Sequence, residues 1–387
     1  MTTPPWNQSG RPSGGAGYLP LERTSAVTEG DPRHTLRRRT RTYLALAVVG
    51  ALLVAALTSL GLPYVVMRAG PVTNILGTTD ESGTAKPVLA IEGATTYPTQ
   101  GELDFTTVVI VGGPGHSATA MDLLVAWLSP SQEVLPEEQV FPPGQTQEEA
   151  DQEGAAEMAS SQEIAAAVAL RSLGKEVKER VTIAEVPDDS PNSGVLQAGD
   201  EILSVAGKPV ATDGALRAEL ARQTPQVPFN VGIRRSGGER TVSIKTVERG
   251  ERRVIGVFLS IDYDLPVKVT INAGGVGGPS AGLMFGLAIH DVLTPGAATG
   301  GQVIAGTGTL DPDGVVGPIG GIRQKMVGAR DDGAQWFLAP ADNCAEVAGS
   351  VPDGLRVVKV GTYAEGVAAL KAIGSGSGDS LATCEAG

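Results

Sequence analysis

The 387-residue sequence is poor in the residue types that build several common kinds of site. Two cysteines cannot form a disulfide framework or a four-cysteine zinc site, and three histidines leave little room for a histidine-built metal centre. A formal net charge of −13 argues against general nucleic-acid binding, which needs a basic face to meet phosphates. We therefore expect no metal, no cofactor and no nucleic-acid partner.

Two further classes of protein are excluded by composition. Hydrophobic residues at 41% and charged residues at 19% are typical of a globular chain rather than a wholly disordered one. The 52 glycines follow no three-residue period, which excludes collagen. A length of 387 residues predicts two or three domains.

Charge is absent from one long stretch, residues 42–67, which is apolar and long enough to cross a hydrocarbon core. One alternative is a cleaved signal peptide, but the run is too long and its end lacks a small-residue cleavage pattern. The other is a buried core helix, which the adjacent cluster of Arg37–Arg39 and Arg41 disfavours. Seven Lys and Arg face three acidic residues in 1–41, whereas 68–387 carries 23 basic and 40 acidic residues. The positive-inside rule then predicts a cytoplasmic tail over 1–41, a transmembrane helix over 42–67 and an extracytoplasmic remainder. The tail is rich in Pro, Gly, Ser and Thr with little apolar content, so we expect it to be disordered.

The membrane-proximal range 68–174 contains no motif that identifies its fold. A β-branched run predicts a strand over 103–111, and helices are expected over 118–128 and 148–173. We describe this range only as a mixed α/β region.

The range 175–250 contains the first specific pattern. A strand at 181–186 leads through Gly194–Val210, with its Gly-Asp corner and Gly-Lys hairpin, to a helix at 213–222 and strands at 229–234 and 241–247. This order resembles bacterial PDZ domains and implies a β-barrel or sandwich. Such domains bind an extended peptide along a strand edge and often capture its terminal carboxylate. The preceding residues Leu-Gly-Lys-Glu-Val are not a clean Gly-Leu-Gly-Phe carboxylate loop, so capture of a C-terminus stays open.

A candidate nucleophile lies further on, where Gly278-Pro-Ser-Ala-Gly fits the pattern G-x-S-x-G. An α/β-hydrolase would need a histidine well after the serine, but the last histidine, His290, follows Ser280 by only ten residues. His34 lies in the basic tail. His116 precedes the serine in the sequence and could act as its base only in a different fold. A Ser-His-Asp triad in hydrolase order is therefore excluded.

A lysine supplies the base in the interpretation we prefer. Gly317-Pro-Ile-Gly-Gly opens a short helix with Lys325 on its first turns. Burial against apolar neighbours lowers a lysine pKa, and the neutral amine then accepts the serine proton. Ser280 begins a predicted helix over 280–293, whose first amides, with the Gly-rich stretch 274–278, would hold an oxyanion.

These two segments, in this order and at this distance, resemble the Lon family of serine peptidases over 251–373. The resemblance implies a compact α+β domain with a Ser-Lys dyad: Ser280 as nucleophile, Lys325 as general base, and Gly278 with the Ser280 amide near the oxyanion. Alone, Ser280 would be read as a helix cap and Lys325 as a solvated residue.

The chain also departs from that family. Members often have an acidic residue where this chain has Gly277, and a Thr-Gly-Glu upstream of the lysine motif, where we place Ala305. Whether Thr307 or Thr309 takes over as the partner of the lysine stays open. No G-x-x-x-x-G-K-[ST] phosphate loop occurs, so the ATP-driven motor of soluble members is not expected.

The sequence thus predicts an α/β multi-domain chain that resembles membrane-anchored, ATP-independent Lon-like proteases of bacteria. Its expected function is serine endopeptidase action on unfolded or exposed protein segments outside the cytoplasm; the alternative is a non-catalytic PDZ scaffold at the cell envelope. Partners would be peptides, the membrane and, in a ring, further copies of the chain. Cys344 and Cys384 either form a disulfide that pins the tail 374–387 or stay free.

Overall fold

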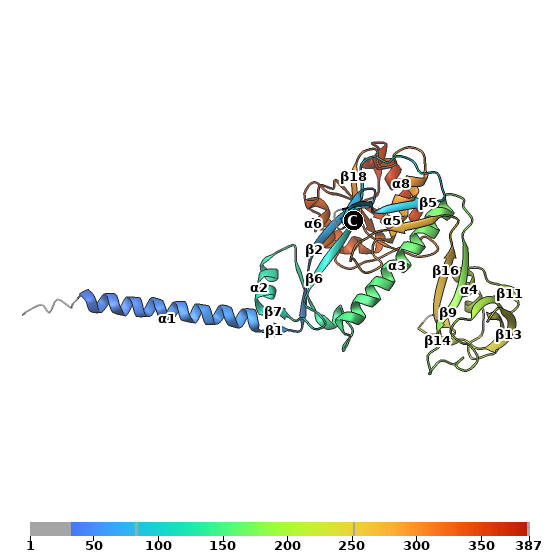
Figure 1. Cartoon of the computed structure of the whole chain (residues 1–387), viewed down its shortest axis with the longest axis horizontal. Coiled ribbons are helices and arrows are strands. Elements are labelled where there is room, and N and C mark those ends of the chain that lie inside the picture. Colours follow the sequence, from blue (N-terminus) through green and yellow to red (C-terminus); the bar gives the residue numbers. More distant parts are fainter. Residues whose placement is uncertain (1–31, 82–83, 251, 385–387) are drawn as a thin grey trace, which may run out of the picture. The chain divides into compact units, whose positions relative to one another are not determined.

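The computed structural model describes residues 32–81, 84–250 and 252–384 (Figure 1). Most of the predicted cytoplasmic tail, 1–31, lies outside the described residues. The helices are α1 (Pro32–Ser59), α2 (Ala120–Leu128), α3 (Gln147–Ser172), α4 (Asp213–Ala221), α5 (Gly282–Leu293), α6 (Ile322–Asp331), α7 (Cys344–Val347) and α8 (Tyr363–Gly374), with 3-10 turns η1 (Glu137–Gln139), η2 (Ala341–Asn343) and η3 (Gly378–Ser380).

Helix α1 contains the apolar stretch that the sequence predicts to span a membrane. Within the described residues, Thr40–Ser59 is the one helical stretch long and apolar enough to do so, with a mean hydropathy of 2.0 over 20 residues. The helix begins earlier than predicted, at Pro32, so that residues 32–41 are helical rather than disordered. It also ends earlier: it stops at Ser59 instead of Met67, because a glycine, a proline and a β-branched pair follow and favour a strand.

The larger sheet combines strands from two distant parts of the chain. Among the described residues, six strands form it in the order β22-β21-β18-β6-β2-β8. The four from β22 to β6 run parallel, and β2 pairs antiparallel with both β6 and β8. The predicted strand 103–111 is thus a central strand of this sheet. Its members are β2 (Tyr64–Asn74), β6 (Glu102–Val111), β8 (Glu133–Pro136), β18 (Val303–Gly306), β21 (Trp336–Pro340) and β22 (Arg356–Val360).

Helices cover both faces of this sheet because its strand residues alternate between two cores. On one face, Leu103 and Phe105 of β6 pack with α3, α5 and α8, and the rings of Phe105 and Phe285 meet edge to face at 5.4 Å. On the other face, Phe337 of β21 packs with Ile322 and Met326 of α6. The sheet thereby holds α5 and α6, the helices next to the two candidate site residues, on opposite faces.

Helix α3 ties the range before residue 174 to these elements. A capping box between Thr146 and Glu149 starts the helix, in which each side chain bonds the other's backbone amide. Its second half is alanine-rich, and Ala165 and Ala169 are fully buried against α5. Much of the range that the sequence left without a fold therefore packs as part of the C-terminal α/β unit.

A second sheet, with its own core, corresponds to the predicted PDZ region. Its strand order is β13-β12-β10-β9-β16, with β11 beside β10. Leu216 and Leu220 of α4 pack on Val205, Val231 and Ile233. The edge strand β16 begins after residue 250, so this sheet continues into the range assigned to the proteolytic region. Its strands are β9 (Lys178–Glu185), β10 (Glu201–Val205), β11 (Lys208–Pro209), β12 (Phe229–Arg235), β13 (Gly238–Ile244) and β16 (Phe258–Asp264).

Short antiparallel pairs complete the fold. They are β1 (Gly61–Leu62) with β7 (Ala118–Thr119), β3 (Thr78–Glu81) with β4 (Thr84–Pro87), β5 (Leu89–Glu92) with β17 (Lys268–Ile271), β14 (Val247–Arg249) with β15 (Arg252–Val254), and β19 (Thr309–Leu310) with β20 (Val316–Gly317).

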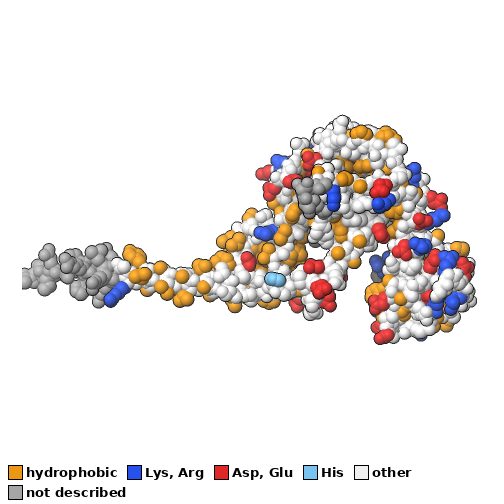
Figure 2. Space-filling model, in the orientation of Figure 1, with side chains coloured by type: hydrophobic (Ala, Val, Ile, Leu, Met, Phe, Trp, Pro, Cys, Tyr) orange, Lys and Arg blue, Asp and Glu red, His pale blue; other side chains and the backbone are white. Residues whose placement is uncertain are grey.

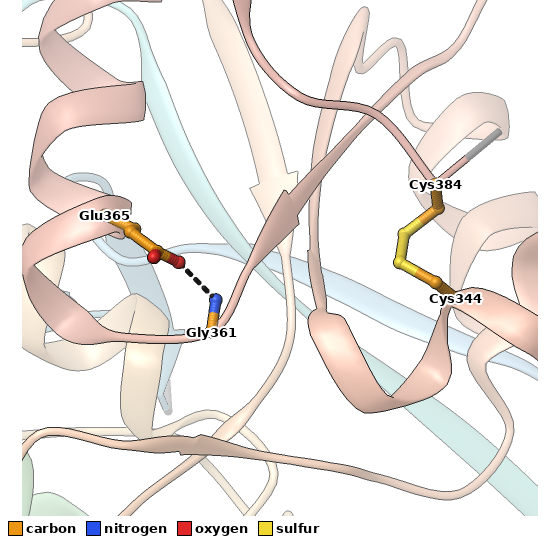
Figure 3. The surroundings of a disulfide bond; sticks show 4 residues. All are labelled: Cys344, Gly361, Glu365 and Cys384. Atoms are coloured by element: carbon orange, nitrogen blue, oxygen red, sulfur yellow. Dashed lines mark hydrogen bonds between the residues drawn. A yellow bond between two sulfur atoms is a disulfide. The ribbon is translucent and has the colours of Figure 1, made fainter. Parts of the chain in front are cut away.

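The C-terminal tail is held against the larger sheet. A disulfide joins Cys344 to Cys384, near the turn where the Gly361 amide donates to Glu365 (Figure 3). The Lys359 amide donates to the Ala382 carbonyl at 2.9 Å, so the tail covers the outer edge of β22. Of the two alternatives for the cysteines, the structure therefore contains the disulfide.

Candidate active site

Ser280 lies in a turn that leads into α5, two residues before the helix begins. The sequence predicts that the serine starts the helix; instead its carbonyl oxygen points to a neighbouring segment. It accepts hydrogen bonds from the Gly308 amide at 2.7 Å and from Thr307 Oγ1 at 2.9 Å. These two bonds fix the backbone of the serine.

Lys325 reaches Ser280 from α6, next to Thr307, which directly follows the end of β18. Gly321, in the left-handed conformation with φ of 70°, caps the helix and allows the chain to turn sharply into it. Lys325 lies in the first turn, is only 3% exposed, and places Nζ 2.7 Å from Ser280 Oγ. The structure therefore brings together the two side chains that the sequence paired, 45 positions apart.

Burial also adjusts the acidity of this lysine. Desolvation lowers the pKa of Lys325 to about 8, because a buried ammonium loses its hydration. No ion pair involves Lys325 in the described part of the chain, so no carboxylate opposes that shift. A substantial fraction of the amine is then neutral near pH 8, as a general base requires.

Thr307 resolves the open question about the lysine's partner. Its side chain is fully buried, and its Oγ1 lies 3.0 Å from Lys325 Nζ. The hydroxyl donates its single hydrogen to the Ser280 carbonyl, so towards Lys325 it accepts. An N–H of the lysine is thereby directed to Thr307, which leaves the nitrogen lone pair of the neutral amine for the hydroxyl of Ser280.

The Gly-rich stretch before the serine is held by α3. The Gly278 amide donates to the Gly154 carbonyl at 2.8 Å, and Ser161 Oγ donates to the Pro279 carbonyl at 3.0 Å. In this conformation Gly278 is therefore not free to donate to an oxyanion, contrary to the expectation for it. The Ser280 amide has no hydrogen-bond partner among the described residues, so of the two expected donors it is the available one.

Sequence reasoning did not find the roles of Gly154 and Ser161. Ser161 carries no signal of its own, and the only one for Gly154 is its position inside a helix, where glycine costs about 1 kcal/mol relative to alanine. The close approach constrains the other glycine: a Cβ on Gly277 would meet Gly154 Cα at 3.1 Å, whereas a Cβ on Gly154 would make only ordinary contacts from 3.5 Å.

A cavity of about 330 Å³ opens in front of the pair. One wall is the continuation of β6 past Phe105, where its pairing with β18 ends; in the described strands nothing pairs with this edge. The same strand stays paired with β2 on its other side. The lining residues are Pro71, Phe105, Thr106, Thr107, Val108, Val109, Met158, Gly275, Val276, Gly277, Ser280, Ala281 and Lys325.

The described histidines stay outside this site. His290 is 5% exposed within α5, and neither ring nitrogen has a hydrogen-bond partner. Burial lowers its pKa, aided by Lys371, which favours the neutral imidazole. His116 is exposed in the turn before β7. Neither residue lines the cavity at Ser280.

Comparison with known families agrees with this arrangement. Residues 162–246 match the family model for the PDZ domain, and residues 256–370 match that of the Lon protease (S16) C-terminal proteolytic domain. The chain therefore carries a PDZ domain followed by a Lon-type proteolytic domain, the domain of a serine-type peptidase. The predicted PDZ and Lon resemblances are confirmed at this level.

Individual relatives match over part of their length. Lon protease 1 of Thermus thermophilus is 36% identical over 22% of this chain and 11% of its own length. Lon protease of Azospirillum brasilense is 38% identical over 26% of this chain and 12% of its own. The PDZ domain of an SdrC-like protein from Listeria monocytogenes is 21% identical, covering 20% of this chain and 85% of that structure, with a TM-score of 0.20.

Proposed function

We propose that this chain is a membrane-anchored serine endopeptidase that cleaves unfolded or exposed protein segments outside the cytoplasm without ATP. The observation that carries the proposal is the distance of 2.7 Å between Lys325 Nζ and Ser280 Oγ in a buried site. A serine hydroxyl is a weak nucleophile until a base within hydrogen-bond reach takes its proton. Lys325 is such a base, and its pKa of about 8 makes the neutral form accessible.

The reaction follows from these positions. The neutral amine of Lys325 takes the hydroxyl proton while Ser280 Oγ bonds to the substrate carbonyl carbon. The carbonyl oxygen becomes an oxyanion, towards which the Ser280 amide donates. The lysine ammonium then gives its proton to the leaving amine as the peptide C–N bond breaks. Water, deprotonated by the same lysine, hydrolyses the acyl-enzyme and restores Ser280.

The substrate would bind as an extended chain along the free edge of β6. That edge presents unpaired backbone groups at 106–109 next to Ser280, and strand addition is a common way to hold a peptide. A folded domain cannot supply such a strand without local unfolding. We therefore expect cleavage of segments that are already extended.

The PDZ domain would select or position these segments. The outer edge of β16 is free to pair with a peptide among the described strands of this sheet. The segment Ile255-Gly256-Val257-Phe258 leads into β16, and Gly256 has a left-handed backbone conformation with φ of 71°. This glycine-containing entry to an edge strand fits a carboxylate loop better than Leu173–Val177 does. The C-terminus of a bound peptide would then be held there by backbone amides.

The proposed location rests on the charge asymmetry around α1. The basic residues that precede it favour a cytoplasmic N-terminus, and the disulfide between Cys344 and Cys384 fits an oxidising compartment. Assembly into a ring of copies stays a prediction from the resemblance.

The decisive test uses the full chain in detergent with an unfolded protein substrate and no nucleotide. We expect cleavage by the wild-type chain and at least about 1000-fold slower cleavage by Ser280→Ala, since removing a nucleophile abolishes the acyl-enzyme route. Lys325→Ala should lose as much, with circular dichroism unchanged for both. Equal cleavage by wild type and Ser280→Ala would contradict the dyad. No cleavage by any of the three, with peptide still bound by the PDZ domain, would favour the scaffold function.

A further inference from the structure

Helix α2 carries an apolar face that the rest of the protein leaves uncovered. Trp127 is 81% exposed and Leu128 71%, and Leu124 and Val125 are also exposed. The spacing of three and four residues places these side chains on one side of the helix, with Ala126 buried. Hydrophobic side chains gather over α2 in Figure 2.

This concentration is unusual within the described residues. Outside α1, eleven large hydrophobic side chains are exposed, and six of them belong to α2 or to the neighbouring positions Leu60 and Tyr64. The one charged side chain of α2, Asp122, is engaged with Thr119 in a capping box at the first turn. Contiguous exposed apolar surface of this kind marks a site of interaction.

The position of α2 in the chain identifies what it meets. Strand β1 directly follows the end of α1 and pairs with β7, whose last residue caps α2. The Ala120 amide, the first of α2, donates to the Leu60 carbonyl at 3.0 Å. Leu60 is the residue after Ser59, where the apolar span ends. The first turn of α2 is therefore hydrogen-bonded to the residue at which the chain would leave a bilayer.

We propose that α2 lies in the headgroup interface of the membrane that α1 spans, with Trp127 and Leu128 inserted among the lipids. The proposal rests on the membrane anchor of the proposed function. Tryptophan favours the boundary between headgroups and acyl chains, and a short helix with one apolar face binds there in the membrane plane. The apolar face of α2 could instead be covered by α2 of a second copy of the chain. The one charged side chain of α2 is Asp122, so two copies of the helix would offer each other no opposite charges.

This contact would also limit where cleavage takes place. Gly112, at the end of β6, lies against Ala118 of β7, since a Cβ on Gly112 would meet the Ala118 Cβ at 3.1 Å. From Gly112 to Thr107 in the cavity wall the strand spans about 17 Å, at roughly 3.3 Å per residue. This length limits how far Thr107 can lie from Gly112, whatever angle β6 makes with the membrane. The cavity would therefore stay close to the bilayer surface. Segments of membrane proteins just outside their spans would be the substrates within reach.

The test measures fluorescence quenching by lipids brominated near the carbonyl end of their acyl chains. The full chain with Trp6→Phe and Trp336→Phe, which keeps Trp127 alone, is reconstituted into phosphatidylcholine vesicles. The matched control keeps Trp336 alone through Trp6→Phe and Trp127→Phe. We expect about twofold quenching and a blue shift for Trp127, as for an interfacial indole, and neither for Trp336.

Flotation of the same vesicles separates this proposal from the anchor. If the chain floats with the vesicles but Trp127 is quenched no more than Trp336, the α2 contact is wrong and the anchor stands. If Trp127 is instead shielded from aqueous iodide without lipid quenching, a protein surface covers it, which also overturns the proposal. A chain that fails to float overturns both. Leu128→Glu should reduce the quenching of Trp127 while flotation persists.

Discussion

The two sheets of this chain are assembled in opposite ways. The PDZ sheet is built from strands between residues 178 and 264, close together in sequence, whereas the larger sheet joins β2 and β6 to strands more than 190 residues later. The candidate active site belongs to the second kind of assembly. Ser280, Thr307 and Lys325 come from three segments, and β6, from a fourth, forms a cavity wall. A site made of remote contacts should be sensitive to single substitutions that a local domain tolerates.

The largest effect after loss of the dyad itself is expected at Thr307. Thr307→Val keeps the shape of the side chain but removes the hydroxyl that bonds Lys325 Nζ and the Ser280 carbonyl. We expect kcat to fall about 100-fold, typical of losing the group that orients a general base. Peptide cleavage at fixed pH measures this. Thr309→Val is the matched control and should stay near wild type; equal losses would mean that the Thr307 bonds do not matter.

A tenfold effect per pH unit is expected from Lys325. Because its pKa in the free enzyme is about 8 and only the neutral amine accepts a proton, kcat/KM should rise about tenfold per unit below pH 8 and level off above it. An initial-rate profile from pH 6 to pH 10 measures this. A flat profile across pH 8 would contradict lysine as the base.

Stability provides the control for that assignment. The folded-state pKa of about 8 lies below the usual lysine value near 10.4, so burying the ammonium costs stability at every pH below 8. That cost, up to about 3 kcal/mol at about 1.4 kcal/mol per pKa unit, declines as pH rises from 8 to about 10.4. Lys325→Met should therefore unfold at higher denaturant than wild type at pH 7, with the gap narrowing towards pH 10.

A tenfold effect is also expected where α3 touches the Gly-rich stretch. A Cβ on Gly277 would press on the Gly154 backbone at 3.1 Å, so Gly277→Ala must shift the segment that precedes Ser280. We expect kcat to fall about tenfold, because small displacements of reacting groups are costly. The matched control is Gly154→Ala, whose Cβ would meet only ordinary contacts from 3.5 Å. It should keep activity and gain helix stability of about 0.5–1 kcal/mol. The reverse ranking of the two variants would contradict this packing.

Much of the local structure was predictable from the sequence, and the reason is visible in particular elements. The helix near 148–173 is alanine-rich and has its own N-terminal cap, the strand near 103–111 is rich in β-branched residues, and the Ser280 and Lys325 motifs carry their own glycines. The pairing of β6 with β18 was not predictable, because no motif marks either edge. The hydrogen bond from Gly278 to Gly154 was missed for the same reason: it depends on how close two backbones come. The helix end at Ser59 was missed because an apolar run continues into strand β2 without a change in hydropathy.

The smallest effect tests whether the two sheets act independently. Arg171, at the end of α3, pairs with the buried Glu179 of β9 at 2.5 Å and stacks on Tyr263 of β16, so it ties the helix that holds the Gly-rich stretch to the PDZ sheet. Arg171→Gln leaves Glu179 without this partner and should cost about 1–3 kcal/mol of stability by chemical denaturation. Because the dyad contacts stay intact, cleavage of a short peptide should be unchanged, while cleavage of a protein with a C-terminal PDZ ligand should fall two- to threefold, about 0.5 kcal/mol.

The matched control is Lys268→Gln, which removes an ion pair with Glu92 in which both side chains are 67% exposed, and it should change neither rate. If short peptides are slowed as much as the protein, Arg171 supports the active site directly, and the division between a local PDZ sheet and a remotely assembled site breaks down.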